Sequence, residues 1–477
     1  MRAGAPRRHL RSSGYYPWHE LDLESTMKKL CTLSLLAASA LLSAQNTFRY
    51  EVEILSTQNR PHEWACEPSV AADPNSFHVV AGSVLDQVHA NEFPFLSKNW
   101  THSTLTSSYG VYGDPILQYD NAGRVYFLHL ANPSGKAHQE GDWLDRIVIQ
   151  WSDDHGKTWS NGSGIGHNPP KDQDKEGISV DPNTNTLHVS WTEFDKYGEA
   201  DRSLYRSRIR YSQSEDRGVT WSPAMTISAH EGDCIDDDET TEGAVPAVDP
   251  LGGVSVIWSV NDTLWFNRSD DDGAATWFEH EVAFASQRGG WAHEIPGFGR
   301  ANGMPISMYD RSGRLHLVFG EQDGDSTWVA YQYSDNRGRY WSRKHILPRP
   351  EGVVHHFMPW FTVDTARGNA LHIIAYGQQD TVNWTTQAYH SVSTDGGETW
   401  GHHALAEAFT PTPASFFGDY NGISAGPMGV HMVWTQQVDG VNSVYHGQYY
   451  EVETTRDPIE TPKSVSNESK KRKKSKR

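Results

Sequence analysis

The chain of 477 residues is poor in cysteine, with only three. Cys31 lies in a segment that we expect to be removed, which leaves Cys66 and Cys234. One pair permits a single disulfide, and two free thiols remain the alternative. Metal binding by two cysteines alone is the less favoured interpretation. A scaffold that depends on several disulfides is excluded.

Long apolar runs and long helical periods are also absent beyond the N-terminal region, so we expect no membrane span there. Met27-Lys28-Lys29, the apolar stretch Leu30–Leu42 and Ser43-Ala44 are typical of a secretory signal. Residues 27–44 are therefore predicted to be a signal peptide, and residues 1–26 an over-extended start. We expect a protein that is secreted or at the cell surface, with its mature start near Gln45.

Basic residues are scarce in the part of the chain expected to fold. Of the 41 Lys and Arg residues, 14 lie outside residues 46–462, as do 4 of the 60 Asp and Glu residues; the net charge of 46–462 is therefore −29 (27 minus 56). Such a surface argues against nucleic acid as a partner. It also argues against a strongly anionic polymer, unless a basic pocket or a bound cation compensates. The tail 456–477 is rich in Lys and Arg at its end and is predicted to be disordered.

One short pattern, Ser-x-Asp-x-Gly-x-Thr-Trp, which we call the box, recurs five times. Complete boxes begin at Ser152, Ser214 and Ser393, and variants begin at Ser269 and Ser334. Successive boxes start 62, 55, 65 and 59 residues apart. Ser and Asp side chains cap tight turns, Gly allows positive φ, and Trp supplies an apolar anchor. An even repeat of this length indicates one supersecondary unit copied many times.

The box resembles the Asp-box, or bacterial neuraminidase repeat, of the sialidase superfamily. The resemblance implies a β-propeller with a glycan site on the face opposite the boxes. Ahead of the boxes, apolar segments lead to turn aspartates and then to alternating strands; these aspartates are Asp73, Asp120, Asp181, Asp249, Asp310 and Asp364. A seventh unit starts near Tyr420. Residues 46–455 are therefore predicted to be one all-β domain of four-stranded antiparallel blades.

Seven blades are favoured over the six typical of sialidases. The last unit has no fourth strand after Tyr450, so the segment Phe48–Leu55 is predicted to supply it and close the ring. A decayed box is expected near Ser97–Trp100 in the first unit.

Acidic side chains stand beside the first strand in five of the seven units: Glu67, Asp114, Glu176, Glu242 and Asp419. Converging carboxylates are what glycoside hydrolysis requires. Our candidate catalytic residues are Glu67, Asp114, Glu242, Asp419 and Tyr420, and our candidate substrate-binding residues are Glu176, His293, Arg300, His355 and His356. The alternative is that these carboxylates only hold the mouth of the ring together. Arg300, the one arginine immediately beside a first strand, is expected to be the lone fixed cation among them.

Two further groups have simpler interpretations. The run Asp233–Glu239 is dense in oxygen ligands and is compatible with a structural Ca²⁺, but it lacks the Gly and distal Glu of a calcium loop, so a solvated loop is favoured. We expect no other cofactor and no metal at the reaction centre. Five histidines are expected at one structural position of the second strands: His78, His188, His316, His372 and His431.

The leading hypothesis for function is a glycan-acting propeller, most plausibly a monomeric glycoside hydrolase. The resemblance is incomplete at the site, because Arg60-Pro61 lacks the Ile of the sialidase Arg-Ile-Pro motif and the arginine clamp is reduced to Arg300. The competing hypothesis is a non-catalytic propeller that binds glycan or protein at the cell surface. A polysaccharide lyase that uses His and Tyr is the third.

Overall fold

The computed structural model describes residues 47–57, 65–83, 85–94, 98–136, 142–270, 276–380, 382–413 and 416–452. Phe48–Glu451 form one compact unit. The predicted start 1–26, signal peptide 27–44 and basic tail 456–477 lie outside the described residues, so they stay predictions. In the described part of the chain, no helix has the length and apolarity that a membrane crossing requires.

The described residues form seven four-stranded antiparallel sheets and one two-stranded sheet. Blade 1 contains β2 (Ser69–Ala72), β3 (Val79–Ser83), β4 (Gln87–Asn91) and β5 (Thr101–Thr104), and blade 2 contains β6 (Ile116–Tyr119), β7 (Val125–Leu130), β8 (Ile147–Ser152) and β9 (Ser163–Ile165). Blade 3 contains β10 (Asp172–Val180), β11 (Leu187–Phe194), β12 (Ser207–Ser214) and β13 (Met225–Thr226), and blade 4 contains β14 (Glu242–Val248), β15 (Val254–Val260), β16 (Thr263–Ser269) and β17 (Val282–Ser286).

The two-stranded sheet, β18 (Ala292–His293) and β19 (Ala301–Asn302), precedes blade 5. Blade 5 contains β20 (Ile306–Tyr309), β21 (Leu315–Asp323), β22 (Ser326–Ser334) and β23 (His345–Ile346), and blade 6 contains β24 (His355–Asp364), β25 (Ala370–Gln378), β26 (Thr386–Ser393) and β27 (Gly401–Ala404). Blade 7 contains β28 (Gly422–Gly426), β29 (Gly429–Val438), β30 (Val441–Val452) and, as its outer strand, β1 (Thr47–Thr57).

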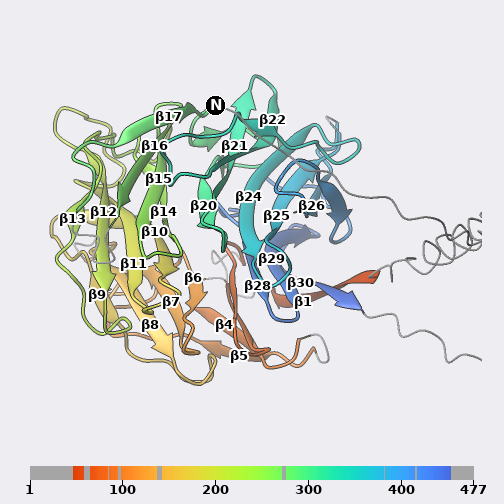
Figure 1. The fold of residues 1–477 in the computed structure, drawn as a ribbon, viewed down its shortest axis with the longest axis horizontal. Coiled ribbons are helices and arrows are strands. Elements are labelled where there is room, and N and C mark those ends of the chain that lie inside the picture. The colour runs from red at the N-terminus through yellow and green to blue at the C-terminus, as the bar shows by residue number, and fades with distance from the viewer. Residues whose placement is uncertain are drawn as a thin grey trace, which may run out of the picture. The chain divides into compact units, whose positions relative to one another are not determined.

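The blades follow one another around a closed ring, which Figure 1 shows in chain order. Each inner strand contacts the inner strand of the next blade, and β28 of blade 7 contacts β2 of blade 1. The prediction of a seven-bladed all-β propeller is confirmed.

The predicted closing segment pairs as expected, because β1 lies beside β30 at the outer edge of blade 7. The Phe48 ring stacks on Tyr449 at 4.8 Å between centroids. Glu53 accepts a hydrogen bond from Trp100 Nε1 of blade 1 (2.7 Å), and Tyr50 bonds to His390 of blade 6 (3.0 Å). The closing strand therefore joins the last blade to both of its neighbours and removes a free edge.

Each complete box is a turn at the end of a third strand, held by its own side chains. In the first box, Gly156 N donates to Ser152 Oγ (2.8 Å), and Thr158 donates from N and Oγ1 to the two oxygens of Asp154 (2.8 and 2.7 Å). The boxes at Ser214 and Ser393 repeat these bonds. The fourth box keeps the bonds to its Asn, whereas the turn of the box at Ser269 lies outside the described residues.

The expected position of the histidines in the second strands is partly wrong. His188, His316 and His372 each pair with the third-strand residue that comes just before the Ser of the box. His431 holds the same position in blade 7, which has no box. His78 lies two residues earlier, in the turn, where its carbonyl oxygen accepts from Asp73 N (2.9 Å). The turn of blade 1, from Asp73 to His78, is longer by one residue than the turns from Asp120 to Arg124 and from Asp310 to Arg314, so the spacing from the aspartate concealed the difference in register.

Box glycines lie against the preceding blade, and the space there differs between boxes. At Gly397 (φ +95°), an added Cβ would come within 2.3 Å of the buried Tyr331 ring of blade 5. At Gly218 (φ +89°), the nearest neighbour would be 3.5 Å away, which is an ordinary contact.

We expect both Gly397→Ala and Gly218→Ala to lower the free energy of unfolding by about 1–3 kcal/mol through backbone strain. Only Gly397→Ala also overpacks a core ring, which adds roughly 1–3 kcal/mol. Urea unfolding of both variants measures the difference. Equal loss in the two proteins would show that packing of the box glycine against the preceding blade contributes nothing.

Candidate functional site

Near the start of the inner strands of blades 1, 2 and 3 stands an ionisable residue in the left-handed backbone region. These residues are Glu67, Asp114 and Lys175, with φ values of 50°, 51° and 52°. A non-glycine residue in this region costs about 1–2 kcal/mol and is uncommon. Local strain of this kind concentrates at functional sites, where the surrounding structure enforces it. Three consecutive blades therefore present strained, charged residues at the same end of the ring.

β-Bulges mark the same end of the inner strands. The pairing of β10 with β11 shifts between Asp174 and Gly177, and that of β14 with β15 shifts between Glu242 and Val245. Bulges redirect side chains and are common beside active sites. The boxes terminate third strands, so in these antiparallel blades they lie at the opposite end. The separation of candidate site and boxes agrees with the sequence analysis.

Ion pairs connect blades that are not neighbours, which is possible only near the middle of the ring. The Lys175 Nζ of blade 3 lies 2.9 Å from Asp419 Oδ2, before blade 7, and 3.3 Å from Asp114 Oδ2, before blade 2. The same Asp419 oxygen accepts from Arg300 Nη2 at 2.6 Å. We call Glu67, Asp114, Lys175, Asp236, Arg300 and Asp419 the axial charge cluster.

The acidic loop contributes one member to this cluster. Asp236 Oδ2 lies 2.8 Å from Arg300 Nη1 and accepts from the Tyr197 hydroxyl at 2.9 Å. Other carboxylates of the loop accept bonds from protein donors: Asp233 from Thr240, Asp237 from Glu239 N, and Asp238 from Ala292 N. The carboxylates of this loop are thus held by the protein's own donors, and the structural Ca²⁺ remains an untested prediction.

Two adjacent carboxyl groups of the cluster have opposite pKa shifts. Burial, followed by the nearby carboxylates of Asp114 and Asp419, raises the pKa of Glu67 well above its usual range. Burial acts on Asp419 in the same direction, but Arg300 and Lys175 outweigh it and lower the pKa of Asp419. The two residues are in contact, because Asp419 N donates to Glu67 Oε1 (3.3 Å). The surroundings thus favour the protonated form of Glu67 and the ionised form of Asp419.

Buried groups with incomplete hydrogen bonding surround the cluster. Burial raises the pKa of Glu176 and of Glu242 well above the usual range. Within the described residues, neither oxygen of Glu176, nor Oε1 of Glu242, nor Oδ1 of Asp419, nor the Tyr420 hydroxyl has a hydrogen-bond partner. Buried polar atoms are usually paired, so this concentration at one end of the ring indicates a place where a polar ligand can bind.

The cluster also borders the channel that runs between the inner strands. This cavity of about 680 Å³ is lined by residues of all seven inner strands. Asp114, Lys175, Glu176 and Tyr420 line it, which places part of the cluster at its wall. Arg300 is the member that reaches solvent, with 34% of its side chain exposed, whereas the Asp419 side chain is fully buried.

Most predicted site residues converge. Glu67, Asp114, Arg300 and Asp419 belong to the cluster, and its charges act on Glu176, Glu242 and Tyr420. The predicted histidines are not members of the cluster and contact other residues. His293 is in β18 against Gly303 and Gly320, His355 is 3.5 Å from Thr327 Oγ1, and His356 faces His402 with 6.3 Å between ring centroids. Cys66 and Cys234 are buried and free, so they form no disulfide.

The expectation that Arg300 is the lone cation is wrong, because Lys175 sits at the centre of the cluster. Lys175 lies at the bulge near the start of β10, and it shares its left-handed backbone with Glu67 and Asp114, which lie just before β2 and β6. Comparing these positions unit by unit would have identified it. Asp236 and Tyr197 were also missed, because their loops meet the cluster only in the closed ring.

The pKa of Asp174, next to Lys175, allows the burial of ionisable groups in this region to be tested. Burial raises the pKa of Asp174 to about 8, although Lys175 acts to lower it. A carboxyl with a pKa raised by folding stabilises the protein when protonated, and this stability is lost as pH rises from about 4 towards 8. Asp174→Asn keeps an acceptor for Lys175 N, which now bonds to Asp174 Oδ1 at 2.8 Å.

We expect Asp174→Asn to raise the free energy of unfolding at pH 8 by more than about 1 kcal/mol. The gain should shrink as the pH is lowered to 5, where the wild-type carboxyl is protonated when folded. Thermal unfolding across this range measures it, and Asp201→Asn at an exposed position is the control. A gain that does not grow with pH would contradict the raised pKa.

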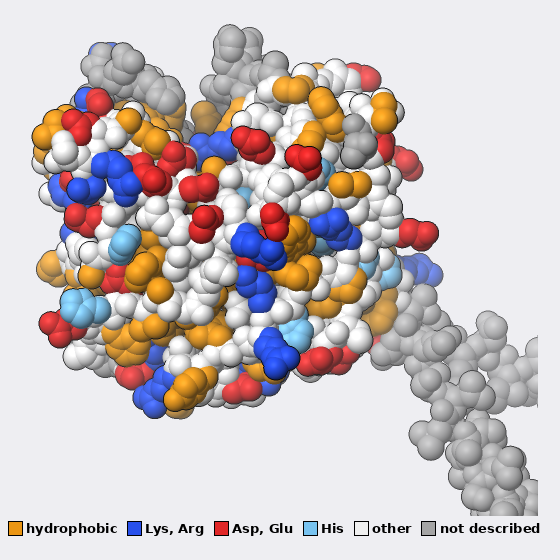
Figure 2. Space-filling model, turned by 90° about the horizontal axis from the view of Figure 1, so that it is seen from above, with side chains coloured by type: hydrophobic (Ala, Val, Ile, Leu, Met, Phe, Trp, Pro, Cys, Tyr) orange, Lys and Arg blue, Asp and Glu red, His pale blue; other side chains and the backbone are white. Residues whose placement is uncertain are grey.

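On the face shown in Figure 2, Lys and Arg side chains form separate groups among acidic and hydrophobic ones. That nucleic acid is not a partner stays a prediction.

Comparisons with known proteins find only distant likenesses to this chain. No protein-family model matches the chain, and no curated protein matches it. Among solved structures, the Hadza microbial sialidase Hz136 is 15% identical, with 79% of this chain and 74% of that one covered and a TM-score of 0.44. The NanB sialidase from Streptococcus pneumoniae is 10% identical (87% and 96% covered, TM-score 0.45). An ulvan lyase of polysaccharide lyase family 25 is 12% identical (85% and 96% covered, TM-score 0.49).

These identities and scores are too low to carry an activity or a family membership to this chain. The assignment of a seven-bladed propeller rests on the strand pairing of this chain alone.

Proposed function

We propose that this protein is a glycoside hydrolase that acts on glycans, with the axial charge cluster as its reaction centre. The observation that carries the proposal is the contact between Glu67, whose pKa is raised, and Asp419, whose pKa is lowered. Titratable pairs whose surroundings push their pKa values apart identify the acid and its ionised partner. Hydrolysis of a glycosidic bond needs such a pair.

In the proposed reaction, Glu67 donates its proton to the glycosidic oxygen as the bond to the leaving sugar breaks. Asp419 stabilises the positive charge that develops on the sugar, as a nucleophile or as the base for water. Lys175 and Arg300 keep Asp419 ionised at neutral pH, because each lies within 3 Å of its Oδ2. Arg300 is partly exposed and is suited to bind a substrate oxygen.

The unpartnered polar atoms fit a substrate rich in hydroxyl groups. Glu176, which lines the axial channel with Tyr420, has two free acceptor oxygens when ionised and one donor when protonated. The Tyr420 hydroxyl can donate or accept. Sugar hydroxyls offer both functions, so bound glycan would satisfy groups that the protein itself leaves unpaired.

A second candidate function, a non-catalytic glycan- or protein-binding propeller, is favoured by the burial of the cluster. Asp114, Asp236 and Asp419 are all ion-paired, and at most 10% of each side chain is exposed. Paired and buried carboxylates also serve to hold a ring together. The lyase hypothesis gains no support, because none of the three predicted histidines contacts Tyr420 in the described residues.

Glu67→Gln provides the main test, because glutamine keeps the shape of the neutral acid but supplies no acidic proton. We expect turnover of natural linkages to fall by about 10²–10⁴, the usual worth of general acid catalysis. Activity on aryl glycosides with acidic leaving groups should fall much less, since these need no proton. A panel of labelled glycosides, assayed with wild type first, identifies the substrate for the comparison.

Glu398→Gln, an exposed change in the box of blade 6, is the matched control and should leave turnover unchanged. The melting temperature of Glu67→Gln should not fall, because the variant removes a buried ionisable group. If wild type binds glycans but cleaves none of the panel, the binding-only function replaces the hydrolase. If Glu67→Gln cleaves all substrates at the wild-type rate, Glu67 is not the acid.

A further inference from the structure

A contact between neighbouring blades recurs on the box face. In blades 2, 3 and 5, the residue just before the box glycine has a left-handed backbone and reaches back to the turn aspartate of the preceding blade. Arg217 Nε of blade 3 lies 2.8 Å from Asp120 Oδ2 of blade 2. Arg337 Nε of blade 5 lies 3.3 Å from Asp249 Oδ2 of blade 4. These arginines link blades through a permanent positive charge.

The interface of blades 1 and 2 replaces this arginine with His155 (φ 57°), whose Nδ1 lies 3.6 Å from Asp73 Oδ2. A second arginine position has changed there as well. His78 holds the turn position that Arg124 and Arg314 hold in blades 2 and 5, as the hydrogen bonds from the turn aspartates show. Two permanent cations are thus exchanged for two imidazoles at one interface.

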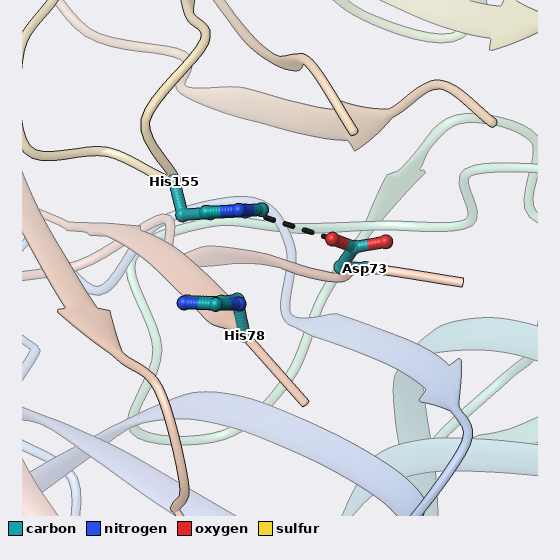
Figure 3. Close-up of side chains that lie close together, drawn as sticks. All are labelled: Asp73, His78 and His155. Carbon is teal, nitrogen blue, oxygen red and sulfur yellow. Dashed lines mark ion pairs between the residues drawn. The ribbon is translucent and has the colours of Figure 1, made fainter. Parts of the chain in front are cut away.

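The three side chains form a compact group. Their potential ligand atoms all lie within 4.8 Å of one another, and no other such group of His, Cys, Asp or Glu occurs among the residues described. Figure 3 shows the imidazole rings face to face with the Asp73 carboxylate beside them; the ring centroids are 3.7 Å apart and the planes 6° from parallel. Asp73 is fixed in place by Asn75 N (2.8 Å) and Ser76 Oγ (2.7 Å).

We propose that Asp73, His78 and His155 bind one divalent first-row transition-metal ion, of the Zn²⁺ class, between blades 1 and 2. Two imidazoles and one carboxylate suit Zn²⁺ and its neighbours, whereas Ca²⁺ and Mg²⁺ prefer oxygen ligands alone. Imidazole is mostly neutral above pH 7, so one ring nitrogen offers a lone pair to a metal ion. Arginine stays protonated and offers none. This site is independent of the proposed hydrolase centre, which lies at the other end of the blades.

The stacked rings require one movement on binding. Lone pairs of parallel imidazoles run in parallel planes and do not converge on one ion, so one ring must turn towards Asp73. Both histidines are partly exposed, which gives them room to turn and gives the ion a route from solvent. The bound ion then takes over the positive charge that arginine brings between blades 2 and 3 and between blades 4 and 5.

His155→Arg is a selective test, because it rebuilds the contact that Arg217 and Arg337 already make and so should keep the fold. Untagged wild type, titrated with ZnCl₂ in a calorimeter at pH 7.5, should bind one ion per chain at a specific site. We expect the affinity to fall at least about tenfold in His155→Arg, since even outer-shell partners of a metal are worth 10–100-fold. Co²⁺ titration should give the absorption of a nitrogen-ligated site in wild type only.

His280→Arg, an exposed substitution in blade 4, is the matched control and should bind Zn²⁺ as wild type does. His78→Arg, which restores the arginine found in blades 2 and 5, should weaken binding as His155→Arg does. The proposal is overturned if wild type shows no specific Zn²⁺ binding. It is equally overturned if both arginine variants retain wild-type affinity, because the ion then binds elsewhere.

Discussion

The candidate site depends on the backbone conformation at the start of the inner strands. Glu67, Asp114 and Lys175 all adopt the left-handed conformation near the start of their strands, and each brings an ionisable side chain to the middle of the ring. Glycine would adopt this conformation without strain, and Gly243 holds the corresponding place in blade 4. Ionisable residues at these positions in three blades therefore impose backbone strain, which indicates that their side chains are needed at the axis.

Charge at the axis is stable only because cations are buried with the carboxylates. Lys175 and Arg300 both contact Asp419, and their partners Asp114 and Asp236 extend the network to other blades. Two cations cannot neutralise every carboxyl group present, so the groups farther from them keep their protons. That division produces the contrast between Glu67 and Asp419. A buried ion network contributes little net stability in general, which favours a role in positioning and in chemistry.

Local patterns in the sequence predict the fold well and the site in part. The boxes, the turn aspartates and the missing last strand are short-range signals, and together they specify seven blades closed by β1. Lys175 was missed as a cluster member because its partner Asp419 is 244 residues away and meets it only after closure. His78 was misplaced because its register depends on the hydrogen bond from Asp73 N, which spacing does not reveal.

Departures from the repeat carry more information about function than the repeat itself. On the box face, arginines join blades at Asp120 and Asp249, whereas at Asp73 His155 stands in this place and stacks on His78. On the opposite face, a lysine stands at the position that is acidic in the two preceding blades. A repeat protein can change one unit at little cost to the others, because away from the axis each blade packs against its neighbours. The unmatched residues of blades 1 to 3 are therefore where selection for binding or chemistry leaves the clearest trace.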